Sequence, residues 1–199
     1  MKMAIAMVAF ILAIVLGGSA GAQSLQQFVA QCSGNNDAVV IQGCTGVLRS
    51  SGISRHNKAV AYTTRGSAHA RQGNLDHAIA DFTDAISRNP RSLPAYYNRG
   101  NVYYTKEEFD NAIADFSHAI ALQPDHVLSY NNLGSAYMAK GEIDRAIAEF
   151  DNALAIDPNS TQAASNRALA YTRKGDVGGV IRNFGAVVKV FFRSIFARD

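Results

Sequence analysis

One interval of 34 residues organises most of this chain. Gly66, Gly100 and Gly134 are separated by that interval. Other residue types keep the same step: Tyr62, Tyr96 and Tyr130; Tyr103, Tyr137 and Tyr171; Ala78, Ala112 and Ala146; Phe82, Phe116, Phe150 and Phe184; Ala85, Ala119 and Ala153; Pro90, Pro124 and Pro158. So many columns in register identify an internal repeat. Periods of this length are typical of stacked repeat architectures.

Each unit predicts two helices joined by a short turn. The units begin at Ala59, Leu93, Val127 and Thr161. The second helix of each unit opens near Asp76, Asp110 or Asp144, where a carboxylate suits the positive end of the helix. It ends before Pro90, Pro124 or Pro158, because proline disfavours helix at the residue that precedes it. In the second unit, apolar residues recur at helical spacing, which predicts one buried stripe per helix.

Small residues predict close contact between the two helices of a unit. Gly100 and Ala112 hold the same unit positions as Gly66 and Ala78. Small side chains that face each other let two helices cross closely, and the Tyr and Phe columns then fill the seam to the next unit. One such hairpin cannot bury both of its faces, so neighbouring hairpins must stack.

The pattern resembles the tetratricopeptide repeat family. The third unit carries the resemblance most fully, with Tyr130, Leu133, Gly134, Tyr137, Ala146, Phe150, Ala153 and Pro158. The first unit departs from the family pattern at His69, where the family has an aromatic residue. The resemblance implies an all-α fold, a right-handed α-solenoid of stacked helical hairpins. It also implies a concave groove that binds peptides or proteins.

The repeat divides the chain into six segments. They are a signal peptide (1–22), a degenerate hairpin (23–58), three repeats (59–92, 93–126 and 127–160), and a degenerate fourth repeat with a C-terminal capping helix (161–199). The leader starts with Lys2, continues with an apolar run over residues 4–16, and ends in small residues that predict cleavage after Ala22. The run is shorter than the ~20 apolar residues of a membrane span, so an uncleaved anchor is the less favoured alternative. We therefore expect a periplasmic or secreted protein of bacterial type.

The two cysteines of the chain both lie in the degenerate hairpin. Stepping back one repeat from Gly66 reaches Cys32, and stepping back from Ala78 reaches Cys44. These are the close-contact positions of a hairpin, and the leader predicts an oxidising compartment. We expect a Cys32–Cys44 disulfide that contributes ~3 kcal/mol, with two buried free thiols as the alternative.

The C-terminal unit changes character. Ala168 replaces the glycine and Val180 replaces the alanine, and a helical stripe follows: Val177, Val180, Ile181, Phe184, Val187, Val188, Phe191 and Ile195. The first interpretation is a capping helix that covers the last repeat seam. The extra apolar residues Val190, Phe192 and Phe196 leave two alternatives open: a surface for homo-oligomers, and a basic amphipathic contact with a membrane.

Catalytic and metal-binding motifs are not evident in this sequence. The histidines do not share a metal-ligand spacing, and no phosphate-binding loop or nucleophile elbow occurs. Asp81, Asp115 and Glu149 share one column, and repetition in every unit favours a structural role. We therefore expect no enzyme activity, no cofactor and no metal. A net charge of +3 is too small to indicate a nucleic-acid partner.

On the resemblance, the inner face of each first helix would bind an unknown peptide or protein. The candidate groove residues are Thr63, Ser67, Arg71, Tyr97, Asn101, Tyr104, Asn131, Ser135, Met138, Ser165, Leu169 and Arg173. Tyr97 and Tyr104 lie outside the packing columns, and exposed Tyr is a frequent interaction hot spot. The charged clamp with which some family members hold the C-terminal carboxylate of chaperones is missing, because Thr63, Ser67 and Leu128 carry no charge.

Overall fold

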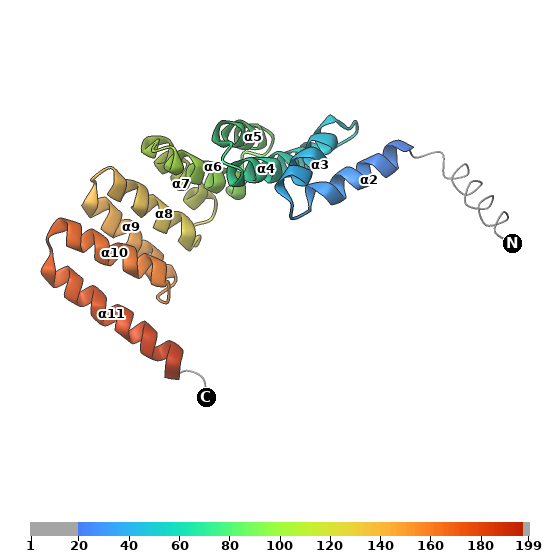
Figure 1. Ribbon diagram of the computed structural model, residues 1–199. Helices are drawn as coiled ribbons and strands as arrows, with labels where there is room; N and C mark the ends of the chain where they lie inside the picture. The colour runs from blue at the N-terminus through green and yellow to red at the C-terminus, as the bar shows by residue number, and fades with distance from the viewer. Residues whose placement is uncertain (1–19, 197–199) are drawn as a thin grey trace.

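Ten helices and no strand make up the part of the chain that the computed structural model describes, residues 20–196 (Figure 1). They are α2 (Ala20–Cys32), α3 (Asp37–Arg49), α4 (Arg55–Arg71), α5 (Leu75–Arg88), α6 (Leu93–Thr105), α7 (Phe109–Leu122), α8 (Val127–Ala139), α9 (Ile143–Ile156), α10 (Thr161–Lys174) and α11 (Val177–Phe196). The predicted signal peptide lies outside the described residues, apart from its last three positions at the start of α2. The all-α repeat prediction is confirmed.

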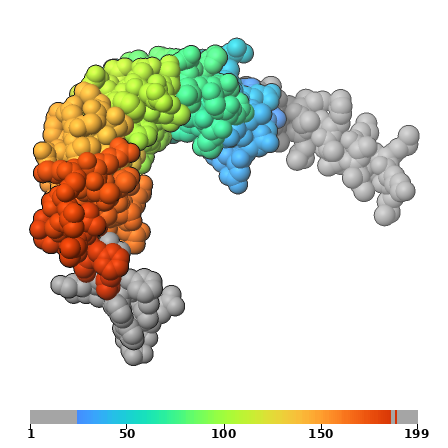
Figure 2. All heavy atoms as spheres, turned by 60° about the vertical axis from the view of Figure 1, so that its left-hand side comes forward, coloured from blue at the N-terminus to red at the C-terminus, as the bar shows by residue number. Residues whose placement is uncertain are grey.

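The helices form consecutive antiparallel hairpins that stack along an arch (Figures 1 and 2). Each first helix, α4, α6, α8 or α10, contacts the first helix before it. Among the described helices, no second helix contacts the next second helix. Because the first helices lie closer together than the second helices, the arch curves toward the first helices. Their free faces therefore line its inner, concave side.

Within each full repeat, a phenylalanine ring packs directly against a glycine. A methyl group added to Gly66, Gly100 or Gly134 would lie 2.9, 2.7 or 2.6 Å from a carbon of Phe82, Phe116 or Phe150. Real side-chain contacts of that kind are longer, so these positions require glycine. All three rings are fully buried, as are the alanines of the two repeated columns, Ala78, Ala112 and Ala146 and Ala85, Ala119 and Ala153. The columns found in the sequence are thus the core of the hairpins.

Polar contacts fix the seam between one repeat and the next. Lys106 lies 2.7 Å from Asp76 of the preceding second helix, and Lys140 lies 2.6 Å from Asp110. Lys174 and Asp144 make the third such pair, at 2.5 Å. These pairs are exposed, so each contributes little energy. Their repetition shows that successive repeats stack in the same register.

The N-terminal hairpin keeps the architecture in a shifted register. Arg65 donates to Thr45 of α3, as Arg99 donates to Thr83 of α5. The separations are 20 and 16 residues, so α3 is displaced by four residues, one helical turn. Helix α4 also begins at Arg55, four residues before the predicted start. The loop around Gly52, whose φ is +75°, absorbs the extra residues.

This shift changes the place of the predicted disulfide but not its pairing. Cys32 and Cys44 are bonded, and their Cα atoms lie 4.6 Å apart. Because of the displaced register, Cys44 occupies the position of Phe82 rather than that of Ala78, and Cys32 occupies that of Gly66. The disulfide therefore replaces the contact between phenylalanine and glycine that closes each later hairpin.

In the last hairpin, Phe184 is not buried as its column predicted. Helix α11 packs on α10, and the Asn183 side chain is buried there, donating to the Ala164 carbonyl at 2.9 Å and accepting from Arg167 at 2.7 Å. Phe184, however, is exposed, so its expected place in the buried column is wrong. Ala168 replaces the glycine on which the ring would lie, and no helix follows to cover it within the described residues. No described helix is long and apolar enough to cross a membrane.

Candidate functional site

The concave face is built from one side of each first helix. A residue at the second, fifth or ninth position of a unit lies on the side of its helix that faces away from the hairpin partner. On α4, Val60 and Ser67 show this, because Val60 is half exposed while the neighbouring Ala61 and Ala68 are buried. The repeat thus presents one strip of each first helix to the interior of the arch.

A cavity of about 440 Å³ opens between α4 and α6. Three predicted groove residues line it together: Ser67, Arg71 and Asn101. Its remaining lining consists of Ala70, Leu75, Phe82, Asn98, Val102 and Thr105. Neither Asn98 nor Thr105 is among the predicted groove residues. The signal for Asn98 was its recurrence as Asn132 and Asn166 in the next units.

The asparagine column connects successive first helices by hydrogen bonds. Asn98 donates to the Ser67 hydroxyl at 3.2 Å. Asn132 donates to the side-chain amide oxygen of Asn101 at 2.7 Å and to the Tyr97 hydroxyl at 3.2 Å. Asn166 donates to the side-chain amide oxygen of Asn131 at 3.0 Å. The amides thus join the first helices of neighbouring repeats and hold the groove in one curvature.

These bonds separate the predicted groove residues into accessible and inaccessible ones. Asn131 is only 1% exposed, so a ligand does not reach its side chain in this conformation. Tyr97 is half-buried, and its ring packs against Phe116 and edge-on to His126. Tyr104 is 37% exposed and contacts Phe109 at its edge. Of the two candidate anchors, Tyr104 is the one that is free to contact a partner.

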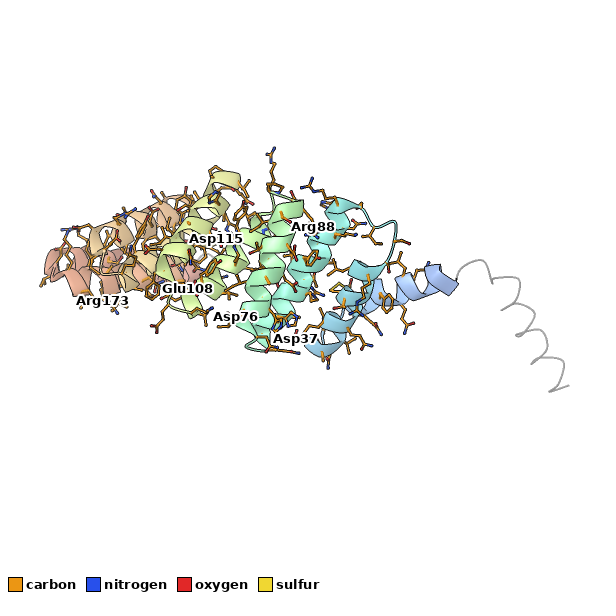
Figure 3. All side chains as sticks on the ribbon, turned by 90° about the horizontal axis from the view of Figure 1, so that it is seen from above. Asp37, Asp76, Arg88, Glu108, Asp115 and Arg173 are labelled. Carbon is orange, nitrogen blue, oxygen red and sulfur yellow. A yellow bond between two sulfur atoms is a disulfide. The ribbon has the colours of Figure 1, made fainter. Side chains whose placement is uncertain are left out.

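The other predicted residues contribute mostly polar surface. The hydroxyls of Thr63 and Ser135 donate to carbonyls of their own helix, both at 2.9 Å. Met138 is partly buried against the core of the third repeat. Ser165 and Arg173 are exposed. Figure 3 shows Arg173 well separated from Asp37, the carboxylate that pairs with the predicted residue Arg71, so the predicted residues form a long strip rather than one compact site.

Exposed apolar side chains interrupt this polar strip in three of the units. Val60 and Leu128 hold the second position of their units and are 52% and 47% exposed, and Leu169 holds a ninth position and is 45% exposed. Val60 also lines a second cavity of about 360 Å³, formed with residues of α2 and α3 such as Leu25, Val29 and Val47. Sequence reasoning did not select Val60 or Leu128, although an apolar residue at a groove position was the available signal.

Charge is scarce along the groove. Arg71 is paired with Asp37 of α3, with Nε 2.8 Å from the carboxylate. The pKa of His126, beside Tyr97, is lowered because burial disfavours the charged imidazolium. We expect His126 to be neutral at pH 7, because its ordinary pKa already lies near 6.5. Between Arg71 and Arg173, the lining therefore consists of neutral hydrogen-bonding groups and separate apolar contacts.

Reactive groups do not converge in the described part of the chain. No cluster of three or more His, Cys, Asp or Glu side chains that could hold a metal occurs there. The buried carboxylates Asp81 and Asp115 are each bonded twice to an arginine, at 2.7–2.8 Å, which matches the structural role expected for their column. The arrangement offers contact surface and hydrogen bonds, which are the means of a binding surface.

Stacked helical hairpins with a concave inner strip define an α-solenoid of the repeat class. A tetratricopeptide repeat model matches residues 59–92, and a TPR repeat model matches residues 100–141 and 134–175. This chain belongs to the tetratricopeptide repeat family.

Solved structures share the fold at low sequence identity. A crystal structure of MamA protein is 21% identical, with a TM-score of 0.79 over 92% of this chain and 97% of that one. MamA residues 41 to the end from Desulfovibrio magneticus RS-1 is 19% identical, with a TM-score of 0.74 over 84% and 94%. The first TPR of Spaghetti (RPAP3), bound to an HSP90 peptide, is 23% identical, with a TM-score of 0.59 over 60% and 95%. No curated protein sequence matches this chain significantly.

Proposed function

We propose that this protein is a non-catalytic interaction scaffold that binds a peptide or protein segment along its concave groove. The observation that carries the proposal is the composition of the inner strip. It combines exposed apolar side chains, of Val60, Tyr104, Leu128 and Leu169, with the neutral amides and hydroxyls of the first helices. The bound structure of the RPAP3 repeat shows that a related fold can hold a peptide.

The chemistry of the groove selects the kind of segment. Its uncharged centre has no cluster of cations to hold a terminal carboxylate or an acidic stretch. Apolar contacts give most of the binding energy at such surfaces, and amides give direction by pairing with the backbone of a ligand. The expected ligand is a segment with low charge and separate apolar side chains.

Variants of exposed residues test this proposal. The mature chain is used to capture partners from its own envelope extract, and synthetic segments of a captured protein are then titrated against it. Tyr104→Ala combined with Leu128→Ser removes two anchors and is expected to weaken binding at least tenfold, about 1.4 kcal/mol. The matched control is Ile156→Ala on α9, because Ile156 is similarly exposed but lies on a second helix. Equal affinity of the groove variant, the control and the native chain would reject the groove as the binding site.

We also propose that the protein is exported and acts in the periplasm or outside the cell. The signal-like residues 1–22 and the Cys32–Cys44 pairing support this, because disulfides persist in oxidising compartments. The test is cell fractionation followed by intact-mass measurement of the purified protein. The expected product starts at Gln23 and has both cysteines oxidised. A cytoplasmic protein that retains Met1 and free thiols would contradict the proposal.

A further inference from the structure

The last helix carries a row of large apolar side chains that nothing in the described structure covers. Val177, Ile181 and Phe184 are 71%, 68% and 69% exposed. Their counterparts one repeat earlier are Ile143, Ile147 and Phe150. Ile147 and Phe150 are buried and Ile143 is partly buried, where α10 follows α9. In Figure 1, α11 forms the end of the arch. The row thus corresponds to the surface that the next repeat covers in the earlier unit, and here it is uncovered.

The row is not suited to a further repeat of the same kind. Each earlier second helix contacts the next first helix through polar groups. Asp144 forms an ion pair with Lys174, and Thr83 accepts a hydrogen bond from Arg99. In α11 these two positions are Gly178 and Gly185. A methyl group built on Gly185 would meet nothing within 4 Å. Helix α11 therefore has no polar side chain at these two positions to bind a following first helix. The surface beside the row is open to close approach by another helix.

The spacing of the row is that of a helix-pairing seam. Val177, Ile181, Phe184 and the partly buried Val188 follow one another at intervals of four, three and four residues. The sequence continues the same alternation at Phe191 and Ile195. Intervals of this kind place every member on one edge of a helix and are typical of coiled-coil contacts. A helix of 20 residues extends about 30 Å, long enough for such a contact.

The charges of α11 indicate what the row can meet. No acidic residue occurs between positions 177 and 196, and Arg182 follows Ile181 in the chain, about 100° around the helix. The row itself is therefore free of charge, with its nearest described cation turned away from it. A partner helix that is apolar along its contact edge fits this surface, and α11 of a second copy has that edge.

We propose that two copies of this protein pair through α11, each covering the Val177, Ile181 and Phe184 row of the other. A contact of this kind uses the same patch on both chains and closes as a two-fold dimer. Head-to-tail pairing with α2 is disfavoured, because the edge of α2 that corresponds to the seam edge of α6 carries Gln27 and Gln31. Three exposed side chains make a small contact compared with a standard interface, which buries about 800 Å² per partner, so we expect the dimer to dissociate on dilution. This pairing does not depend on ligand binding in the groove.

The test is the mass of the mature chain in solution, measured by sedimentation velocity over a range of micromolar concentrations. The native chain is expected to shift from monomer to dimer as its concentration rises. Ile181→Asp with Phe184→Asp is expected to leave only monomer, while the control Ile156→Asp on α9 keeps the native behaviour. A native chain that stays monomeric, or a dimer that the double variant leaves intact, overturns the proposal.

Gly185→Leu distinguishes a partner helix from a lipid surface. Because the position is open in the single chain, the added side chain leaves the fold intact, which circular dichroism can verify. It blocks close approach of a second helix, so the dimer should weaken at least tenfold. A membrane contact would instead gain apolar area and strengthen. Flotation with anionic phosphatidylglycerol vesicles measures this. Vesicle binding that Gly185→Leu strengthens, in a chain that is monomeric in solution, would overturn the dimer in favour of a membrane contact.

Discussion

Arg99 binds Asp115 through two parallel hydrogen bonds, both 2.8 Å long, inside the second repeat. The same arrangement joins Arg65 and Asp81 in the first repeat. The third repeat has Leu133 and Glu149 at these positions, and the fourth has Arg167 bonded to the neutral Asn183. The pKa of Arg99 is raised chiefly by its hydrogen bond to Asp115, so the guanidinium stays charged over the ordinary pH range. The pairs fix the two helices of a hairpin against each other.

Removing one partner of the Arg99–Asp115 pair should lower the free energy of unfolding more than removing both partners. Asp115→Ala leaves the Arg99 guanidinium partly buried without its carboxylate, and we expect a loss of about 3 kcal/mol in the free energy of unfolding. Arg99→Leu with Asp115→Leu should lose much less, since the third repeat already has Leu133 at the arginine position. Urea unfolding followed by circular dichroism measures both. The exposed pair of Arg88 and Asp84 is the control, where Asp84→Ala should cost less than about 1 kcal/mol. Equal losses for the single and double variants would contradict this view.

Glu107 is strained in the turn of the second repeat. Its φ is +60°, whereas glycine stands at the same place in the other repeats, with φ of +77° at Gly73 and +80° at Gly141. Non-glycine residues lose roughly 1 kcal/mol in this conformation. Glu107→Gly should therefore raise the free energy of unfolding by about that amount. Thermal unfolding checks this, with Glu107→Ala as the control that removes the carboxylate but keeps the strain. Equal stability of the two variants would show that strain is not the cause.

The Cys32–Cys44 disulfide should stabilise the N-terminal hairpin locally. It closes a loop with a separation of 12 residues, which corresponds to about 3 kcal/mol in the chain-entropy view. Reduction, or Cys32→Ser with Cys44→Ser, should therefore speed hydrogen exchange in α2 and α3. Exchange in α8 and α9 should change little, because stability in repeat arrays is distributed over nearest neighbours. Uniform destabilisation of the whole array by reduction would contradict a local role.

His69 should make the stability of the first repeat depend on pH. Burial lowers the pKa of His69 below 6.5, and this outweighs the opposite influence of Asp81. The unfolded chain therefore binds a proton more readily than the folded chain. The contribution of the neutral imidazole is complete above pH 6.5 and is lost as the pH falls through the lowered folded pKa. Stability should decrease as the pH falls below about 6.5.

His69→Tyr tests that dependence, since the equivalent positions in the later repeats are Tyr103, Tyr137 and Tyr171. Tyrosine does not titrate in this range, so the variant should have a smaller change in the free energy of unfolding between pH 7.5 and pH 5.5. Urea unfolding at the two pH values provides the comparison. An unchanged pH dependence would assign the effect to other groups, such as His126, whose pKa is also lowered by burial.

The periodic columns allowed the repeat helices and most of their bounds to be predicted, because a stacked repeat has the same neighbours in every unit. The degenerate ends did not follow the period. Cys44 is one helical turn from its predicted register, because the first hairpin is four residues shorter between these contact positions and the loop that follows it is longer by the same amount. Phe184 kept its column in the sequence but not its burial, because burial requires Gly rather than Ala168 as its neighbour, and a following helix.

For the groove residues too, the sequence determined some properties and the tertiary structure determined others. The amino-acid sequence by itself determined the fold, the cysteine pairing and the strip of each first helix that faces inward, because these depend on spacing along the chain. Only the tertiary structure decided that Asn131 is enclosed, that Tyr104 is more accessible than Tyr97, and that the apolar row of α11 is uncovered. Accessibility depends on which groups of the neighbouring helix lie opposite each side chain. The spacing of residues along the sequence does not contain that information.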